Sequence, residues 1–309
     1  GARDEALNLW AKVLADRPWH VNLAAHRHDC LHNLDRGGSD AVPTGPPGRT
    51  LVLLYTYNKA AALDGTLATL AASQGWHRAV VLNNGSSDDT GLVLTAWSER
   101  LGSERLTVVT LPVNIGAPAA RNWLKALPET AASDFVAYCD DDVLLPADWL
   151  GQLELARRAY PDAAVWGCRV TDATTPHLIQ SADLHLVPAA WSTRREPELD
   201  AEGRDIMSRA HVTKLSLSEL HHQCLDMGQF TYVRPCLSVT GCCHLFPTAE
   251  LLAAKDFPLG LGPTQYDDVA HDLELAVAGK YACYQGFLAV PHVKSTGRAT
   301  PQSRAQYGN

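Results

Sequence analysis

The sequence predicts an α/β protein with a Rossmann-like, mostly parallel central sheet flanked by helices, and with a small N-terminal helical hairpin in front of it. Three observations predict this fold. From residue 50 onward, short apolar segments typical of buried strands alternate with longer segments whose apolar residues recur at helical spacing. Polar residues cluster directly after several of the apolar segments. A stretch rich in glycine and proline separates this region from two helical stretches at the start.

The hairpin is expected within residues 1–36, where Pro18 interrupts the helical pattern and divides it into two helices. One pair of helices cannot bury its own apolar face, so the hairpin could be the end of a helical array or could contact another protein. His28 and His32 stand one helical turn apart and could bind a metal, but they lack carboxylates or cysteines in phase with them. Residues 37–49 contain the glycines and prolines and are expected to form a linker.

One domain is expected from residue 50 to residue 300. Its alternation of strands and helices implies crossover connections, which make neighbouring strands parallel and cover both faces of the sheet. Ligands of such sheets bind at the carboxyl ends of the strands. Strands are expected at 51–55, 79–82, 106–110 and from Phe135, and helices at 63–72, 88–100 and 117–127.

Polar side chains follow each of the four expected strands, so we expect them to meet in one crevice. They are Thr56, Tyr57 and Asn58 after the first strand, residues 83–90 after the second, Asn114 and Gly116 after the third, and Asp140, Asp141 and Asp142 after the fourth. Three adjacent carboxylates at a strand end repel one another and are costly to desolvate. A divalent ion such as Mg²⁺ or Mn²⁺, shared with substrate phosphates, would neutralise them. The alternative is a solvated, inert acidic loop.

Composition excludes several other classes of partner. With 309 residues, 46% of them hydrophobic, the chain can bury a large core. A net charge of −8 argues against nucleic acids or anionic membranes as main partners. Its apolar runs are far shorter than the roughly 20 residues that span a bilayer. The first residues lack the layout of a signal peptide, and the eight cysteines form no Cys-x-x-Cys pair, which favours reduced thiols and a cytoplasmic location.

The polar clusters together resemble the nucleotide-binding half of a family 2 glycosyltransferase. The resemblance is carried by Thr56-x-Asn58, by the run from Asn84 to Thr90, by Asn114-Ile115-Gly116 with Ala120-Arg121-Asn122, and by Asp140-Asp141-Asp142. It covers about residues 50–150 and resumes from about 238 to 297. It implies a GT-A fold, a nucleotide-sugar donor, and a divalent metal, Mn²⁺ or Mg²⁺, held by Asp140 and Asp142.

The resemblance also implies roles for the donor-binding half. The residues expected to place the donor are Thr56, Tyr57, Asn58, Asn84, Asn114, Gly116, Arg121, Asp140 and Asp141. Many family members have Asp where this chain has Asn84. An amide can still pair with a uracil edge, so a UDP-linked donor is expected. The fork of Arg121 could clasp a diphosphate, and a structural salt bridge is the rival explanation.

Residues 170–297 are expected to form the acceptor-binding and catalytic-base half. An acidic pair, Asp267 and Asp268, begins a helix that ends before Gly279; the resemblance makes Asp268 the catalytic base, with Asp267 beside it. Asp272, one turn further on, is the alternative base. Leu273, Ala276 and Val277 are expected to face the core from this helix.

Three further expectations concern this half. His292 stands where family members often place a late metal or diphosphate ligand, and an ordinary loop residue is the alternative. His244 could touch substrate, although a satisfied buried histidine is the favoured interpretation. Residues 170–235 lack a strand–helix rhythm and are expected to form an acceptor wall or lid, or else a surface insertion.

The function expected from these residues is transfer of a sugar, with inversion, from a nucleoside diphosphate-sugar to a hydroxyl of a glycan, a protein or a small molecule. A metal-dependent nucleotidyltransferase acting on a sugar phosphate is one alternative, but the chain has no basic glycine-rich loop after the first strand to hold a triphosphate. A non-catalytic nucleotide-sugar-binding module is the other.

Overall fold

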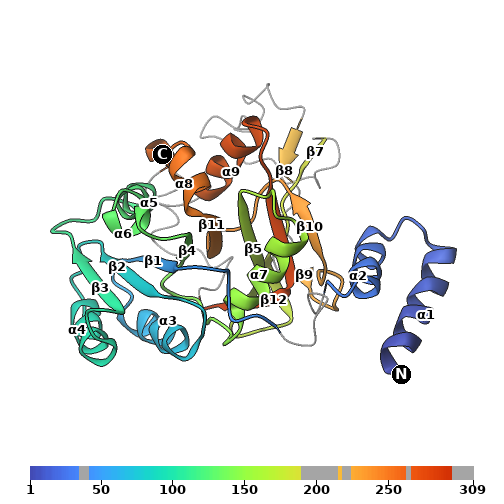
Figure 1. Cartoon of the computed structure of the whole chain (residues 1–309), viewed down its shortest axis with the longest axis horizontal. Helices are drawn as coiled ribbons and strands as arrows, with labels where there is room; N and C mark the ends of the chain where they lie inside the picture. The colour runs from blue at the N-terminus through green and yellow to red at the C-terminus, as the bar shows by residue number, and fades with distance from the viewer. Residues whose placement is uncertain (35–41, 189–214, 218–223, 262–265, 294–309) are drawn as a thin grey trace, which may run out of the picture.

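The computed structural model describes residues 1–34, 42–188, 215–217, 224–261 and 266–293 (Figure 1). Residues 189–214 and 218–223 of the expected acceptor wall, and the end of the expected domain beyond 293, lie outside these residues. Within the described part, ten strands form one sheet, and the path through it runs β10-β12-β5-β11-β4-β1-β2-β3, with β6 paired to β5 and β9 paired to β6. Helices cover both faces of the sheet, and the N-terminal hairpin lies at one end (Figure 1).

The first half of the sheet is wholly parallel, as predicted. Its strands are β1 (Thr50–Thr56), β2 (Arg78–Asn83), β3 (Leu106–Thr110) and β4 (Phe135–Cys139). Strand β1 lies between β4 and β2, and β3 forms the edge. Because all four strands run in the same direction, their carboxyl ends lie at one edge of the sheet.

The helices between these strands follow the expected positions. They are α3 (Ala60–Ala72), α4 (Thr90–Leu101), α5 (Ala117–Lys125) and the short α6 (Pro128–Ala131). One expectation was wrong: the helix predicted at 117–127 stops at Lys125. Pro128 then begins α6, since proline favours the first turn of a helix and breaks the interior of one.

Alternate residues of each strand enter two different cores. Val52 and Leu54 of β1 pack with apolar residues of α3, α4 and α7 (Trp149–Ala159), whereas Leu51 and Leu53 pack with those of α5, α8 (Thr248–Ala253) and α9 (Asp267–Val277) on the other face. All four side chains are at most 3% exposed. This burial on both faces explains why the strands read as continuous apolar runs.

The second half of the sheet mixes directions. It contains β5 (Val165–Asp172), β6 (Leu178–Ser181), β9 (Cys224–Leu225), β10 (Val233–Cys236), β11 (Cys243–Pro247) and β12 (Ala282–His292), with α8 (Thr248–Ala253), the 3-10 helix Leu259–Leu261 and α9 (Asp267–Val277) between them. Strand β11 runs antiparallel between β4 and β5, while β12 runs parallel to β5. Strands β7 (Leu186–Pro188) and β8 (Leu215–Leu217) form a separate pair.

The predicted hairpin is present as α1 (Ala2–Asp16) and α2 (Val21–Leu31). Helix α2 is docked on the domain: the Asp29 carboxylate, only 1% exposed, accepts a hydrogen bond from the Val233 backbone N–H, and the His26 ring contacts the Thr231 carbonyl. Trp19 remains 73% exposed, and a hollow of about 580 Å³ lies between α2 and residues 225–229.

Residues 42–49 of the expected linker lie against the domain. The Arg49 N–H donates to Asp134 Oδ2 at 2.7 Å, and the position of a Cβ on Gly151 would fall 1.8 Å from the Pro43 carbonyl oxygen. A glycine at 151 in α7 therefore allows this segment to approach the helix closely. The described part of the linker is fixed on the domain surface.

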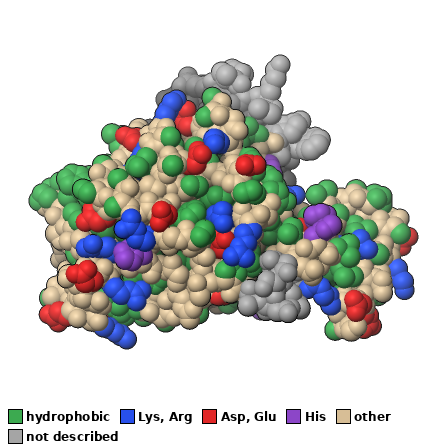
Figure 2. All heavy atoms as spheres, in the orientation of Figure 1, with side chains coloured by type: hydrophobic (Ala, Val, Ile, Leu, Met, Phe, Trp, Pro, Cys, Tyr) green, Lys and Arg blue, Asp and Glu red, His purple; other side chains and the backbone are tan. Residues whose placement is uncertain are grey.

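Two observations concern the whole described chain, and a third concerns one face of it. All eight cysteines carry free thiols, and seven of them are buried. Among the described helices, none combines the length and the apolar character needed to cross a membrane. Acidic and basic side chains are interspersed over the face of the domain shown in Figure 2.

Candidate active site

Asp140, Asp141 and Asp142, the acid triplet, follow β4, and two of them contact the ammonium group of a lysine. Lys59, the residue before α3, places its Nζ 3.0 Å from Asp141 Oδ1 and 2.6 Å from Asp142 Oδ2. Both carboxylates are buried, whereas the Asp140 side chain is 24% exposed. Burial raises the pKa of Asp141 to about 6, although Lys59 opposes the shift. Burial alone would also raise the pKa of Asp142, but His292 and Lys59 outweigh it and hold that pKa well below its usual range.

His292, at the end of β12, lies beside the triplet. Its Nε2 is 2.9 Å from Asp142 Oδ1, and its Nδ1 donates to Gln180 Oε1 at 2.7 Å. The backbone fixes this approach, because His292 forms an isolated bridge with Val143 and the Val293 N–H donates to the Asp142 carbonyl at 2.8 Å. The structure therefore brings His292 to the acids.

Ligand atoms of Asp140, Cys242 and His292 lie within 4.8 Å of one another. A carboxylate, an imidazole and a thiolate together suit a divalent first-row metal. Asp142, which was expected in this set, contacts His292 through Oδ1 and forms an ion pair with Lys59 through Oδ2. The sequence allows Cys242 and Cys243 as a redox or metal pair but favours two small apolar residues of a buried strand, so Cys242 was not predicted as a member of this set.

The donor-side loops are tied together by two asparagines. Asn84 Nδ2 donates to Asn114 Oδ1 at 2.9 Å, and Asn84 Oδ1 accepts from the Ile115 N–H at 3.0 Å. Both polar groups of the amide expected to read the base therefore bond to the loop after β3. Gly85 permits this contact: its φ is +76°, and a Cβ there would fall 2.5 Å from the Val113 carbonyl carbon.

Asn58 plays a similar part for the loop after β1. With a positive φ of 52°, it accepts hydrogen bonds through Oδ1 from the Ser87 N–H at 2.7 Å and the Asp88 N–H at 3.3 Å. Thr56 is fully buried, and Tyr57 is 38% exposed. Gly116 caps the start of α5 with a φ of +82°. The loops after β1, β2 and β3 thus form one connected surface beside the acids.

Arg121 connects the two halves of the site. Its buried guanidinium donates to Asp267, and its Nη2 lies 3.6 Å from Asp140 Oδ1. The guanidinium also lies 5.4 Å from the Tyr55 ring centroid. A salt bridge, the rival explanation for Arg121, is therefore present, and it places the side chain between the acid triplet and the start of α9.

Asp268 is held beside this pair. Its Oδ2 accepts from the Gly241 N–H at 2.6 Å. Burial raises the pKa of Asp268, while the nearby Arg121 charge opposes the shift and Asp267 adds to it. A Cβ on Gly241 would fall 2.6 Å from Arg121 Nη2 and 3.0 Å from Asp268 Oδ2, so a larger residue would force the ends of these two side chains to shift.

Asp272, the alternative base, faces the protein core. It is 1% exposed, and its Oδ2 accepts from Ser238 Oγ at 2.7 Å and from the Val239 N–H at 3.2 Å. His244 is also buried, with Nε2 2.7 Å from the Val239 carbonyl, which matches the favoured interpretation of a satisfied histidine. The expectation that Val277 packs inward was wrong, because this residue is 86% exposed. The buried face of α9 is instead formed by Asp267, Val269, His271, Asp272 and Leu275.

Two other residues of the site were not foreseen. Lys59 directly follows Asn58, and its charge, opposite to that of the triplet, was a usable signal. Gln180 offered none, because its place beside His292 depends on the pairing of β5 with both β6 and β12.

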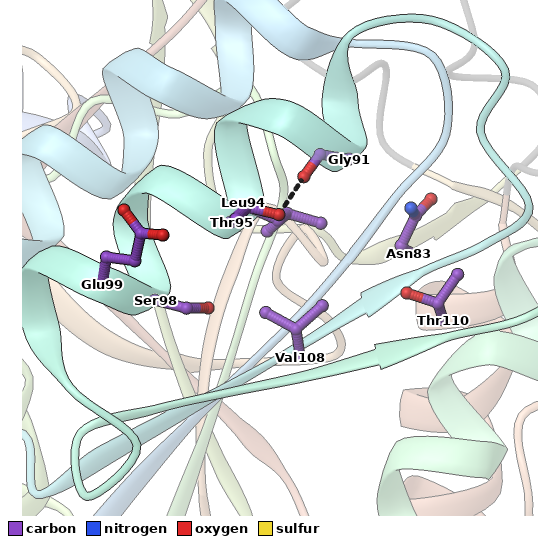
Figure 3. A pocket seen from close by; sticks show the side chains of 8 residues that line it. All are labelled: Asn83, Gly91, Leu94, Thr95, Ser98, Glu99, Val108 and Thr110. Carbon is purple, nitrogen blue, oxygen red and sulfur yellow. Dashed lines mark hydrogen bonds between the residues drawn. The ribbon is translucent and has the colours of Figure 1, made fainter.

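A separate hollow of about 370 Å³ lies between α4 and the ends of β2 and β3 (Figure 3). Its lining includes Leu94 and Val108, and the Thr95 hydroxyl at its wall donates to the Gly91 carbonyl at 2.9 Å. None of the three acids lines it. It is therefore distinct from the carboxylate site.

The chain was compared with known proteins by sequence and by structure. No curated protein matches the chain by sequence. A solved mannosyltransferase, PcManGT from Pyrobaculum calidifontis in complex with GDP-Man and Mn²⁺, shares 17% identity at a TM-score of 0.54, over 97% of this chain and 72% of that one. GalNAc-T7, solved with UDP, GalNAc and Mn²⁺, shares 11% identity at a TM-score of 0.58, over 81% of this chain and 44% of that one.

At these identities the likeness concerns the fold, which is GT-A, as the resemblance implied. The amino-acid sequence shows the family to which the chain belongs. The family model described as glycosyl transferase family 2 matches residues 51–218, more than half of the chain. The protein therefore belongs to glycosyl transferase family 2.

Proposed function

We propose that the protein transfers a sugar from a nucleoside diphosphate-sugar, with UDP as the favoured nucleotide, to an acceptor hydroxyl with inversion. The main support for this proposal is the position of Arg121, whose guanidinium contacts Asp267 and lies 3.6 Å from Asp140. It brings the proposed donor and acceptor halves into one site. The two solved relatives contain GDP-Man and UDP with GalNAc, so the nucleotide is the first variable to test.

Donor placement is assigned to the loops after the parallel strands. Thr56, Tyr57, Asn58, Asn84, Asn114 and Gly116 belong to these loops or flank them. Their mutual hydrogen bonds support a rigid nucleotide platform, because a preorganised site loses less entropy on binding. Arg121 would contact the diphosphate with its fork, exchanging part of its contact with the acids for contact with phosphate oxygens.

The residues present fit a divalent cation such as Mn²⁺ or Mg²⁺. Asp140 and His292 would hold it, and Asp142, the third residue that the sequence singled out, lies beside His292 and pairs with Lys59. A bound ion would neutralise negative charge on the departing diphosphate. Asp141 would remain behind these ligands with Lys59 as its partner.

Asp268 is the proposed general base. It would accept the acceptor's hydroxyl proton while the acceptor oxygen bonds to the anomeric carbon. The bond from that carbon to the diphosphate oxygen would break, and its electron pair would leave with the diphosphate. Attack from the face opposite the leaving group inverts the anomeric centre. The raised pKa of Asp268 supports this role, because a more basic carboxylate is a better proton acceptor.

The experiment is a donor panel of UDP- and GDP-sugars, each with and without Mn²⁺, scored by release of free nucleoside diphosphate and by the anomeric configuration of the product in NMR. We expect metal-dependent release and an inverted product. Pyrophosphate formed from a nucleoside triphosphate and a sugar phosphate would instead identify a nucleotidyltransferase. Donor binding without turnover across acceptors of every class would favour a binding module.

A further inference from the structure

We propose that the thiolate of Cys242, together with Asp140 and His292, is a protein ligand of the divalent cation. This inference rests on the proposed function for the presence of a metal, and it deepens that function by naming the third ligand and the class of metal. Ligands of a tetrahedral zinc-like ion, each at about 2.0–2.3 Å from it, stand about 3.3–3.8 Å apart. The three ligand atoms lie within 4.8 Å of one another, so side-chain movements of about 1 Å close the site.

The backbone places Cys242 opposite Asp140. In the antiparallel pair of β4 and β11, Cys243 is the register partner of Cys139, so the next position pairs Cys242 with Asp140. The Asp140 N–H donates to the Cys242 carbonyl at 3.1 Å, which continues the ladder to this position. Directly opposed residues in such a pair hold their Cβ atoms about 4.5–5.5 Å apart. The juxtaposition of carboxylate and thiol is therefore a property of the sheet.

Both ring nitrogens of His292 have an oxygen partner. Its Nδ1–H donates to Gln180 Oε1 at 2.7 Å, and its Nε2 lies 2.9 Å from Asp142 Oδ1, so an ion would take the place of the Nε2 contact. The imidazole is 9% exposed, and hydrogen bonds from the Ala173 N–H to the His292 carbonyl and from the Val293 N–H to the Asp142 carbonyl hold its backbone on both sides. The hydrogen bond from Nδ1–H to Gln180 is of the kind that orients metal-binding histidines.

Asp141 and Asp142 are already paired with the ammonium group of Lys59. Lys59 Nζ lies 3.0 Å from Asp141 Oδ1 and 2.6 Å from Asp142 Oδ2. Asp140 lies farther from its nearest cation, Arg121, at 3.6 Å, and it has the most exposed side chain of the triplet. An ion arriving from solution therefore meets Asp140 first, with Cys242 and His292 behind it. Asp142 then serves to position Lys59 and the ring of His292.

The thiolate sets the class of metal. On binding, the Cys242 S–H proton passes to solvent and the sulfur takes its place as a ligand. Sulfur is a soft ligand, so the site prefers Zn²⁺ or Co²⁺ over Mn²⁺ and Mg²⁺, which favour oxygen ligands. The structure thus predicts that Mg²⁺ binds weakly here.

The test uses the full chain, freed of metal, titrated with Co²⁺ and followed by absorption. The wild type is expected to show a sulfur-to-cobalt charge-transfer band in the near ultraviolet. Cys242→Ser should lose the band and bind Co²⁺ at least about tenfold more weakly, because a hard hydroxyl replaces a soft sulfur. Cys224→Ser, which removes the one exposed thiol, is the matched control and should keep the band.

A wild-type protein that binds Co²⁺ without the band, or a Cys242→Ser variant that keeps it, would overturn the proposal. If Cys242→Ser does not fold, ¹¹³Cd NMR of the wild type decides: a resonance at the shift of a site without sulfur contradicts a thiolate ligand. Failure of the proposed function is distinguishable. A charge-transfer band without turnover of any donor would support the Cys242 metal site and contradict the transferase function. Turnover without a band would support the transferase function and contradict Cys242 as a ligand.

Discussion

Lys59 Nζ lies 2.6 Å from Asp142 Oδ2 and neutralises an acid of the triplet without any metal. Its second contact, 3.0 Å from Asp141 Oδ1, leaves Asp140 as the acid that turns its side chain toward solvent. Two adjacent buried carboxylates would otherwise repel each other at a strand end. The ammonium therefore stabilises the metal-free fold and separates structural acids from the proposed ligand.

Removal of this ammonium gives the first prediction. Lys59→Met should lower the free energy of unfolding by about 2 kcal/mol, less than for a fully buried pair because the lysine side chain is 39% exposed. Added Mn²⁺ should raise the melting temperature of the variant more than that of the wild type, because the ion supplies the lost positive charge. Differential scanning calorimetry with and without Mn²⁺ measures both effects.

Lys280→Met is the control for this variant. Lys280 pairs with Glu250 at 2.9 Å, and both side chains are about as exposed as Lys59, at 42% and 34%. An exposed pair contributes about 0–1 kcal/mol, so this variant should remain close to the wild type with and without Mn²⁺. Equal losses in the two variants would show that the position of Lys59 between the acids is unimportant.

The acids of α9 give the second prediction. Asp268→Asn should lower kcat about 10²–10⁴-fold, the usual contribution of a general base, with little loss of stability. Its pKa is raised by burial, so the folded state already disfavours the charge that the substitution removes. Turnover assays on a donor found by the panel, paired with urea unfolding, check both parts.

Asp272→Asn should behave in the opposite way. Its Oδ2 accepts two buried hydrogen bonds, from Ser238 Oγ and the Val239 N–H, and an amide cannot reproduce the charge that strengthens them. We expect a loss of about 1–3 kcal/mol in unfolding free energy and an unchanged kcat per folded molecule. A catalytic defect confined to Asp272→Asn would move the base one turn along the helix.

Gly241 gives the third prediction. Gly241→Ala should lower kcat by at least about tenfold, because misplacing catalytic groups by about 1 Å is costly. The added Cβ would fall 2.6 Å from Arg121 Nη2 and 3.0 Å from Asp268 Oδ2, so both side chains must move. Gly91→Ala is the control: a Cβ there meets nothing within 4 Å, and alanine in α4 should stabilise by about 0.5–1 kcal/mol. Equal kinetics for both variants would contradict the packing argument.

The parallel half of the fold could be predicted because its signals are local. Short apolar runs such as Leu51 to Leu54, alternating with helical segments, predict strands buried between two helical layers, and the polar residues that follow such parallel strands share one edge. The direction of β11 could not be predicted. A strand from Cys243 to Pro247 reads the same whether it runs parallel or antiparallel to β4.

The missed members of the site share a physical cause. Lys59 and Asp142 are 83 residues apart, and Cys242 meets Asp140 only because β11 is inserted between β4 and β5. Such contacts depend on strand order, which hydrophobic periodicity does not encode. For the same reason, the docking of Asp29 onto Val233 could not be seen from a helical pattern that suggested a separate hairpin.

Asp183 shows a similar long-range contact with a consequence for pH. The side chain is fully buried and accepts from Tyr232 OH at 2.7 Å, from Arg234 Nε at 2.6 Å, and from His185 Nε2 at 2.7 Å. Burial would raise its pKa, but His185 and Arg234 outweigh burial and hold the pKa well below the ordinary value of 3.8. This carboxylate joins the segment after β6 to β10.

The fourth prediction follows from the sign of that shift. As pH falls below about 4, the unfolded chain binds the proton of Asp183 before the folded chain does, so stability that is present above pH 4 is lost toward the lower, folded pKa. Asp183→Asn should lower the unfolding free energy by about 3–5 kcal/mol at pH 7 and flatten its dependence on pH below 4. Asp148→Asn, at an exposed carboxylate bonded to Gln152, should change neither. Urea unfolding from pH 2.5 to 7 measures these curves, and an Asp183→Asn curve parallel to the wild type would contradict a depressed pKa.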